Sequence, residues 1–329
     1  MKRFTVILLI IALVAGTLFA AGAAEEKLDF PDPEKTITII VPQGAGGGTD
    51  QQCRVFAECL KKVTGANFIV EDVPGGSTGI GTNQVINSEP DGYTLLMYGT
   101  YVVCGTMTGY TEGFKQLDLI AGLSLEPFTV AVHKDSKWQT FEELIEDAKA
   151  NPGKITLSNA GAVATTGIVC YGINGACGDA FNVVSFSSGA EQLSAMLGKH
   201  CDAAIFDQNS VVSNPDFRPL VFLGTEHSLV ESLSSLPLLS EIYPDWVVPN
   251  GCFRGIAAPK GTPQAVKEWL ADACEKAFNE PEYQAFLKKN GILSTFSKLD
   301  DFDKFNEDMV KTMTPIVQAT GLAKGEYAL

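Results

Sequence analysis

The sequence has few residues that could catalyse a reaction or hold a metal. Its 329 residues include only three histidines, His133, His200 and His227, which are far apart and lack metal-ligand spacing. No C-x-x-C or H-E-x-x-H pattern occurs. His200-Cys201-Asp202 lies between a helical pattern and an apolar run, so we interpret it as a helix-to-strand connection. We therefore expect no catalytic residue, no metal and no cofactor, and we predict that the protein is not an enzyme.

Basic residues are also scarce. The chain has 24 Lys and Arg against 39 Asp and Glu, a formal net charge of −15. Nucleic acid is a poor partner for such a chain, because no basic stripe offsets the negative field. An anionic ligand would have to be held locally, by backbone N–H groups or by one or two well-placed basic residues.

The N-terminus has the pattern of a secretory signal. Met1-Lys2-Arg3 precedes a charge-free run that ends in Ala21-Gly22-Ala23, an A-x-A cleavage pattern. We expect residues 1–23 to be removed, which takes away two cations and moves the net charge from −15 to −17. An uncleaved membrane anchor is the alternative. No cysteine precedes Cys53, so we expect a periplasmic protein that is not a lipoprotein.

Eight cysteines, an even number, would meet an oxidising compartment after export. We therefore expect at least one disulfide, with Cys170–Cys177 the nearest pair that could close a short loop. Cys53 and Cys59 share one predicted helix and point in different directions, so we do not expect them to pair. The alternative is that most of the cysteines are small buried apolar residues.

A glycine-rich segment joins the first strong strand to the first helix of the predicted mature chain. Residues 36–41 are a short β-branched run, typical of a buried parallel strand. Gln43 to Thr49 follow, and Thr49 with Gln52 fits a capping box at the start of a helix. Such a unit directs unpaired N–H groups and the positive end of a helix dipole at one place. We therefore predict an anion-binding site here.

Strand and helix patterns alternate along the rest of the chain, which favours an α/β fold. Further strands are expected at residues 68–70, 93–98, 128–132, 155–157 and 255–258, the last being the final strand before two or three helices. Thr140 with Glu143 predicts a capped helix to Ala150. The strand at 155–157 again runs into a small-residue loop and a helix. Two such units in separate blocks indicate two lobes that face a shared cleft.

Several blocks resemble one family in order and composition. They are Ile39-Ile40-Val41-Pro42, Gly46-Gly47-Gly48-Thr49-Asp50, Pro90 to Leu96, Ala148 to Lys154, Ser158-Asn159-Ala160-Gly161, Leu197-Gly198-Lys199 with Asp202, Arg218-Pro219-Leu220 and Ala258 to Pro263. The chain resembles the extracytoplasmic substrate-binding receptors of tripartite tricarboxylate transporter systems, the Bug type. The blocks cover nearly the whole predicted mature chain.

The resemblance implies a type II periplasmic binding fold, with two α/β lobes joined by crossover segments around a ligand cleft. One lobe would comprise residues 24–125 and 250–329, and the other residues 126–249. By family correspondence the ligand-binding positions are Gln43, Gly44, Ala45, Gly47, Gly48, Thr49, Gly99, Thr100, Ser158, Asn159, Ala160, Gly161, Phe186, Ser187, Ser188 and Asp207. From their own positions we add Arg254, because Arg suits bidentate carboxylate recognition, and Tyr101 as a pocket wall.

Two charged residues near this loop are not expected to bind the ligand. Asp50 is expected to brace the start of the first helix, because its carboxylate would repel an anion. Arg54, one turn further, is expected at the surface or as a brace.

The function that this resemblance implies is capture of a small organic acid, expected to be a carboxylate, by lobe closure. The receptor would be a monomer that delivers its ligand to a large and a small membrane transporter subunit. A sensing receptor that feeds a signalling partner is the alternative. Gln43 and the Ser185–Gly189 segment depart from the usual family pattern, so the ligand's identity does not transfer.

Overall fold

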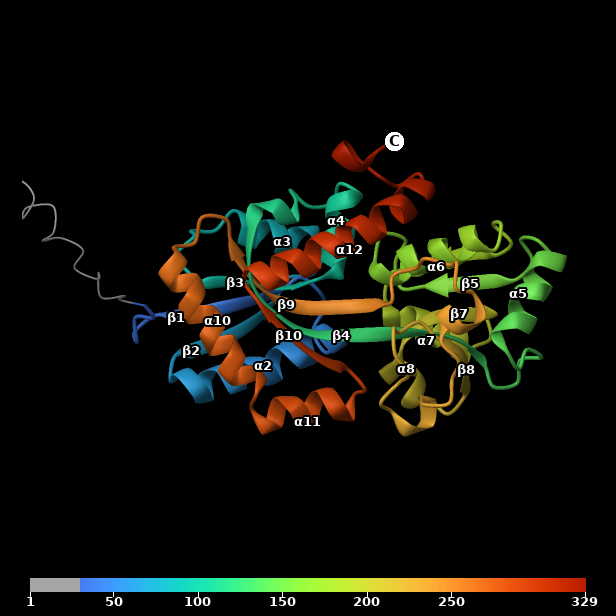
Figure 1. Cartoon of the computed structure of the whole chain (residues 1–329), viewed down its shortest axis with the longest axis horizontal. Coiled ribbons are helices and arrows are strands. Elements are labelled where there is room, and N and C mark those ends of the chain that lie inside the picture. Colours follow the sequence, from blue (N-terminus) through green and yellow to red (C-terminus); the bar gives the residue numbers. More distant parts are fainter. Residues whose placement is uncertain (1–29) are drawn as a thin grey trace, which may run out of the picture. The chain divides into compact units, whose positions relative to one another are not determined.

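Ten strands form one mixed sheet in the computed structural model, which describes residues 30–329 (Figure 1). The predicted signal, residues 1–23, lies outside the described residues. The account below concerns the unit Pro33–Leu329. The strands are β1 (Thr36–Val41), β2 (Asn67–Asp72), β3 (Thr94–Gly99), β4 (Leu117–His133), β5 (Thr156–Asn159), β6 (Asn182–Ser185), β7 (Ala203–Asp207), β8 (Phe217–Phe222), β9 (Gly251–Pro259) and β10 (Leu293–Lys298).

The helices lie between these strands and after β9. They are α2 (Gly48–Thr64), α3 (Gly79–Ile86), α4 (Thr100–Met107), α5 (Phe141–Ala150), α6 (Thr165–Ala176), α7 (Gly189–Leu197), α8 (Gln208–Val212), α9 (Leu239–Ile242), α10 (Gln264–Phe278), α11 (Pro281–Lys289) and α12 (Asp300–Ala319). Strand–helix alternation therefore follows the sequence pattern as predicted.

The strands β1, β2 and β3 form the parallel start of the sheet. β1 pairs with β2 on one side and with β3 on the other, and both pairings are parallel. Ile37, Ile39 and Val41 on one face of β1 and Ile40 on the other are buried, as a parallel strand covered on both faces requires. α2 follows β1 and ends at Thr64, and the N–H of the left-handed Gly65 caps the helix by donating to the Lys61 carbonyl. The carboxyl end of β1 and the start of α2 thus meet as the sequence predicts.

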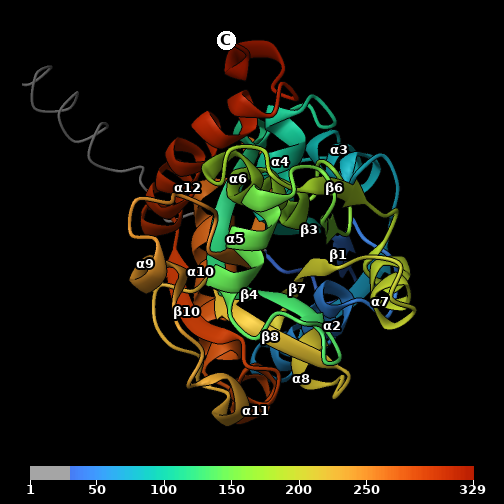
Figure 2. The same cartoon turned by 90° about the vertical axis from the view of Figure 1, so that its right-hand side faces the viewer.

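Two long strands, β4 and β9, run antiparallel through the middle of the sheet (Figure 1). The first half of β4 pairs with β9 and β10, and its second half pairs with β7 and β8. β7 and β8 lie on either side of the second half of β4 (Figure 1 and Figure 2). β5 then pairs in parallel with β6 and β7. The predicted lobe boundaries, 24–125 plus 250–329 and 126–249, stay a prediction.

Three predictions about local structure are confirmed or corrected by these elements. The Thr140 hydroxyl accepts the Glu143 N–H at the start of α5, as predicted. β9 is not the last strand, because β10 follows α11. The predicted strand at residues 128–132 is only the second half of β4, which begins at Leu117 and ends at His133.

The disulfide prediction is wrong for this structure. All eight cysteines are free and buried. Cys170 lies within α6 and Cys177 caps its end. Seven residues along a helix separate the two by about 10 Å, too far for a disulfide. The Cys170 thiol contacts the Leu157 and Ser158 carbonyls instead. The alternative interpretation, buried small apolar residues, fits the structure.

Candidate functional site

The loop between β1 and α2 leaves several backbone N–H groups free. Its residues 44–48 are exposed. Gly46 has φ +79°, the left-handed region that glycine adopts at little cost, and its N–H donates to Asp50 Oδ2 at 2.7 Å. Within residues 30–329 no acceptor takes the N–H of Gly48 or of Thr49, the first two residues of α2. These donors remain available at the positive end of the helix.

Asp50 braces this loop, in agreement with the expectation. Its Oδ1 lies 2.6 Å from Arg54 Nε, and Arg54 Nη2 lies 2.6 Å from Asp72 Oδ2. Arg54 is half-exposed, whereas Asp50 is buried. Burial, and then the nearby Asp50 carboxylate, raise the pKa of Asp72. The Arg54 cation thus offsets two carboxylates beside the loop and reduces their repulsion of an anion.

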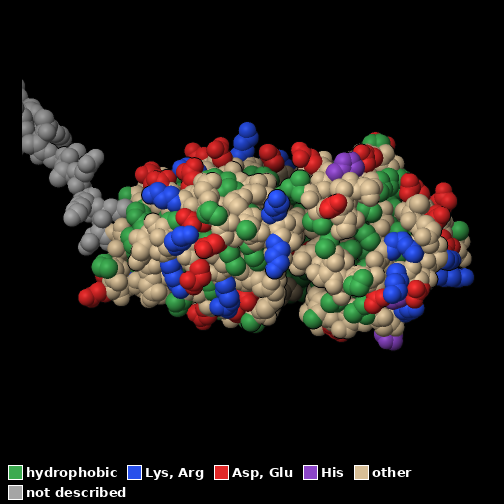
Figure 3. All heavy atoms as spheres, turned by 90° about the horizontal axis from the view of Figure 1, so that it is seen from below, with side chains coloured by type: hydrophobic (Ala, Val, Ile, Leu, Met, Phe, Trp, Pro, Cys, Tyr) green, Lys and Arg blue, Asp and Glu red, His purple; other side chains and the backbone are tan. Residues whose placement is uncertain are grey.

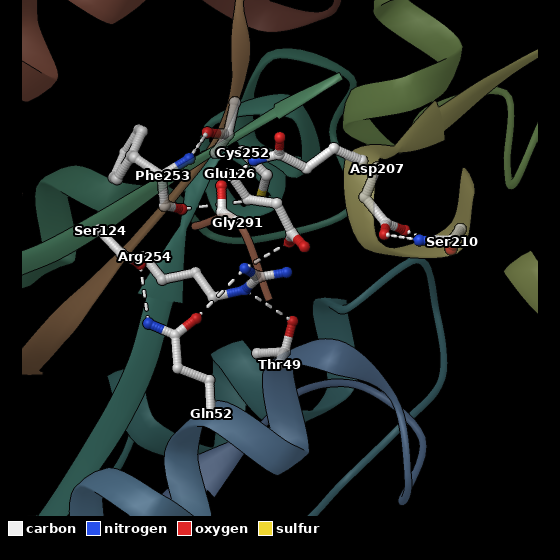
Figure 4. Close-up of polar contacts among 12 residues, drawn as sticks. Thr49, Gln52, Ser124, Glu126, Asp207, Ser210, Cys252, Phe253, Arg254 and Gly291 are labelled. Atoms are coloured by element: carbon white, nitrogen blue, oxygen red, sulfur yellow. Dashed lines mark hydrogen bonds and ion pairs between the residues drawn. The ribbon is translucent and has the colours of Figure 1, made fainter. Parts of the chain in front are cut away.

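Arg254 of β9 lies beside the start of α2 and is buried (Figure 4). Its Nη1 is 2.6 Å from Glu126 Oε2 of β4, and Nε donates to Thr49 Oγ1 at 3.1 Å. Burial disfavours the charge on Arg254, but the Glu126 carboxylate outweighs it and raises the pKa of Arg254, so the side chain stays a cation. Arg254 therefore connects both long strands to α2.

Gln52 completes this polar cluster. It is fully buried, and its Nε2 donates to Ser124 Oγ at 2.7 Å and to Tyr283 OH at 2.8 Å. Its Oε1 accepts from Arg254 Nη1 at 3.2 Å. The capping-box prediction is therefore wrong: α2 begins at Gly48 after Gly47, and no side chain caps it. Thr49 and Gln52 instead use their side chains to hold Arg254.

One edge of the Arg254 guanidinium remains available to a ligand. Within residues 30–329, Nη2 makes no hydrogen bond or ion pair. A Cβ on Gly48 would lie 3.7 Å from this nitrogen. Gly48 also carries one of the free N–H groups. Two kinds of unpaired donor, backbone and guanidinium, therefore meet at Gly48, and we call this place the α2 seat.

The end of β3 differs from what the family correspondence implies. Gly99 ends β3 and Thr100 begins α4 at once, so the two do not form a loop. Thr100 is buried, and its Oγ1 accepts the Phe253 N–H at 3.0 Å. Tyr101 is also buried, and its hydroxyl donates to the Met97 carbonyl. Their side chains thus support α4 and β9, and Tyr101 does not form an open pocket wall.

The residues at the end of β5 and just after it are mostly engaged in local contacts. Ser158 is fully buried, and its hydroxyl donates to the Ala203 carbonyl at 3.2 Å. Asn159 Oδ1 accepts the Gly161 N–H at 2.9 Å, while its buried Nδ2 lacks a hydrogen-bond partner among the described residues. Ala160 and Gly161 are partly exposed. These last two are therefore the members of the set that reach solvent, and the Ala160 N–H donates to Thr166 Oγ1 at 3.2 Å.

Within residues 126–249, two of the predicted ligand-binding side chains cap helices instead. Ser188 Oγ accepts the Glu191 N–H at the start of α7, and Ser187 bonds the Glu191 carboxylate. Asp207 Oδ1 accepts the Ser210 N–H at 2.8 Å at the start of α8 (Figure 4). Phe186 is partly exposed. Both carboxylate oxygens of Asp207 accept hydrogen bonds from Ser210. Among the described residues, Ser187, Ser188 and Asp207 make no hydrogen bond or ion pair with Arg254.

Sequence reasoning missed Glu126, Gln52 and Ser124. Glu126 is the one acidic residue in an otherwise apolar stretch of β4 after Asp118, and this isolated charge was an available signal. Gln52 and Ser124 carry no comparable signal, since their partners come from distant parts of the chain.

One hydrolase-like pattern also needs its structural context. Gly75-Gly76-Ser77-Thr78-Gly79 has the G-x-S-x-G spacing of a nucleophile turn, and it lies between β2 and α3. The general base that such a serine needs is not beside it. His133 ends β4, His227 lies near Glu241 and His200 follows α7. The histidines therefore do not form a triad with Ser77.

Comparison with known proteins decides the family. Residues 52–322 match the sequence profile described as tripartite tricarboxylate transporter family receptor. The chain belongs to this receptor family. A curated relative from Cupriavidus necator, named UPF0065 protein in gbd 5'region, is 29% identical over 96% of this chain and 97% of its own length. The family comprises solute-binding receptors and is not a class of enzymes.

Solved structures of receptors in this family share the fold. A TctC solute-binding protein from Polaromonas is 26% identical, with a TM-score of 0.71 over 88% of this chain and 98% of that chain. The periplasmic binding protein BugD is 24% identical, with a TM-score of 0.77 over 89% of this chain and 100% of that chain. The predicted α/β periplasmic binding fold is therefore confirmed. Within residues 30–329, no helix has the length and apolar character that crossing a membrane requires.

Proposed function

We propose that this receptor captures a small organic acid at the α2 seat through a carboxylate group. One observation carries the proposal: the free N–H groups of Gly48 and Thr49 and the unpaired Nη2 of Arg254 meet at the same place. Backbone donors at a helix start and a guanidinium edge are both suited to a carboxylate. The proposed seat has little side-chain bulk, so a ligand can approach the backbone closely.

The charge balance of the seat favours a singly charged group. Arg254 is already paired with Glu126, so the two side chains together add no net charge. The start of α2 contributes roughly half an elementary positive charge. Acidic and basic side chains are intermixed on the face in Figure 3, without a basic stripe. This weak positive field suits a carboxylate better than a doubly charged phosphate.

Two more distant structures support the ligand class. The Rhodopseudomonas palustris protein Rpa4515 was solved with adipate and MatC with bound malate, each 18% identical to this chain, with TM-scores of 0.79 and 0.76. Both ligands are carboxylates. We propose the class and leave the individual compound open, since Gln43 and the Ser185–Gly189 segment depart from the usual family pattern.

We further propose that residues 126–249 close over the seat. Ala160, Gly161 and Phe186 are partly exposed and are the candidates to contact the ligand from that block. We propose that residues 1–23 direct export to the periplasm and that the loaded receptor serves a large and a small transporter subunit. The family name supports this partner.

Calorimetry with malate and adipate tests the seat. In Gly48→Val the added side chain extends from a Cβ that lies 3.7 Å from Arg254 Nη2, so it enters the seat. We expect at least a tenfold loss of affinity, about 1.4 kcal/mol. Gly175→Val is the matched control, because a Cβ there meets nothing within 4 Å. Wild-type affinity in a folded Gly48→Val protein would exclude the α2 seat.

A further inference from the structure

A pocket of about 320 Å³ lies between α12, β10 and the central strands β4 and β9. Phe253, Phe302 and Phe305 supply aromatic walls, and Asp301 lies at α12 beside them. Phe253 and Phe305 meet edge to face, with ring centroids 5.1 Å apart at 89°. Phe305 is 39% exposed, so one wall of the pocket reaches solvent.

The phenylalanine walls of this pocket point away from the α2 seat, although Ser124 and Arg254 also belong to the pocket lining. Neighbouring residues on a strand point to opposite faces. Phe253 packs on Phe302 of α12, whereas the next residue, Arg254, bonds Thr49 of α2. The phenylalanine walls and the Arg254 side chain thus lie on opposite faces of β9. A ligand in the pocket would be a second ligand, distinct from the carboxylate.

Irregular strand pairing helps to form the pocket. The pairing of β4 with β9 shifts register between Gly122 and Ser124, and that of β10 with β4 shifts between Ser294 and Ser297. The residues inside these shifts, Leu123 and Thr295-Phe296, line the pocket. Bulged residues leave ladder groups unpaired and are enriched beside functional sites. The pocket therefore combines aromatic walls with irregular stretches of two strands.

Asp301 gives the pocket its charge preference. Within residues 30–329 its carboxylate has no ion-pair or hydrogen-bond partner. The faces of aromatic rings also attract cations. The one cation in the lining, Arg254, is neutralised by its ion pair with Glu126. The unpaired Asp301 carboxylate beside phenylalanine rings therefore favours a cation with an apolar body and disfavours an anion.

We propose that this pocket binds a small organic ammonium ion with an aromatic body. The proposal does not depend on the α2 seat, because it rests on the phenylalanine rings and Asp301, whereas the seat rests on the Gly48 and Thr49 N–H groups and Arg254 Nη2. The ring would pack among Phe253, Phe302 and Phe305, and the ammonium group would pair with Asp301.

Ligand-observed NMR titration with 2-phenylethylammonium tests this, with neutral 2-phenylethanol as the comparison. Phe305→Ala should weaken binding of both compounds by about fivefold or more. Asp301→Asn should weaken the ammonium ion about three- to tenfold and leave the alcohol unchanged. Asp300→Asn, on the same helical turn but outside the pocket lining, is the matched control and should leave both affinities unchanged.

The proposal fails if 2-phenylethylammonium shows no saturable binding to the wild-type protein. It also fails if Phe305→Ala and Asp301→Asn bind it as the wild type does. Because Phe305 is partly exposed and Asp301 is exposed, both variants should fold, which circular dichroism checks.

Discussion

Arg254 and Glu126 form a buried ion pair between the two central strands, with Nη1 and Oε2 2.6 Å apart and each side chain only 7% exposed. Taking two charges out of water is costly, and the pair is retained through the added contacts of Arg254 with Thr49 and Gln52. The pair joins β4, β9 and α2 at one point. Loss of either partner should therefore affect stability as well as binding.

Glu126→Gln should destabilise the protein by about 3–5 kcal/mol, because it leaves the Arg254 cation buried without a counter-charge. Urea denaturation measures the change. Asp308→Asn removes the exposed pair with Lys311 and serves as the control, with little or no change expected. Equal stability of Glu126→Gln and wild type would mean that the ion pair is not formed in solution.

Gln52→Leu should cost about 2–4 kcal/mol in the free energy of unfolding. The substitution removes the partner of Ser124, Tyr283 and one N–H of Arg254, all of which are buried. Gln51→Leu is the matched control, since Gln51 is exposed and its amide reaches only the Gly46 carbonyl. A Gln52→Leu protein no less stable than Gln51→Leu would contradict the network.

Stability should fall on acidification partly through Asp147. Hydrogen bonds from Lys137 and then Trp138 lower the pKa of Asp147 below its usual value near 3.8. The unfolded chain therefore binds a proton at higher pH than the folded chain does. The contribution is complete above the unfolded pKa and is lost as pH falls through the folded one.

Urea denaturation between about pH 5 and pH 3 measures this dependence. Asp147→Asn should flatten the decline, and Glu146→Gln on the same helix controls for net charge. An unchanged slope in Asp147→Asn would show that the pKa of this carboxyl is the same in the folded and unfolded chains.

All eight cysteines should behave as protected thiols. Each is free and buried, so Ellman's reagent should label few or none of them in the native protein. In guanidinium without reductant all eight should react. Six or fewer reactive thiols in the denatured protein would reveal a disulfide and revive the expectation drawn from the sequence.

Local patterns predicted the elements that depend on nearby residues. The β-branched run of β1 and the Thr140 cap of α5 followed directly from sequence spacing. β10 was missed because it is a polar edge strand, Leu-Ser-Thr-Phe-Ser-Lys, whose place depends on pairing with β4. Its alternation is too weak to distinguish it from a loop.

The candidate site was predictable only in part. The glycine loop and Arg254 stood out by residue type and position. Thr49 and Gln52 fit a capping box locally, but Arg254, from far along the chain, takes both side chains. Tertiary contacts of this kind override local signals, so the polar cluster could not be assembled from spacing alone.

The pairing of β3 with β9 also affects how the chain folds. β3 is complete early in synthesis, but its antiparallel partner on that edge, β9, is made only after the whole segment 134–250. Until then β3 is an open edge, and closing so long a loop is entropically slow. The strands β5 to β8 can form meanwhile from their own shorter-range contacts. The insertion of β9 between β3 and β4 is therefore a late event, and the carboxylate seat, which needs Arg254, is assembled only with it.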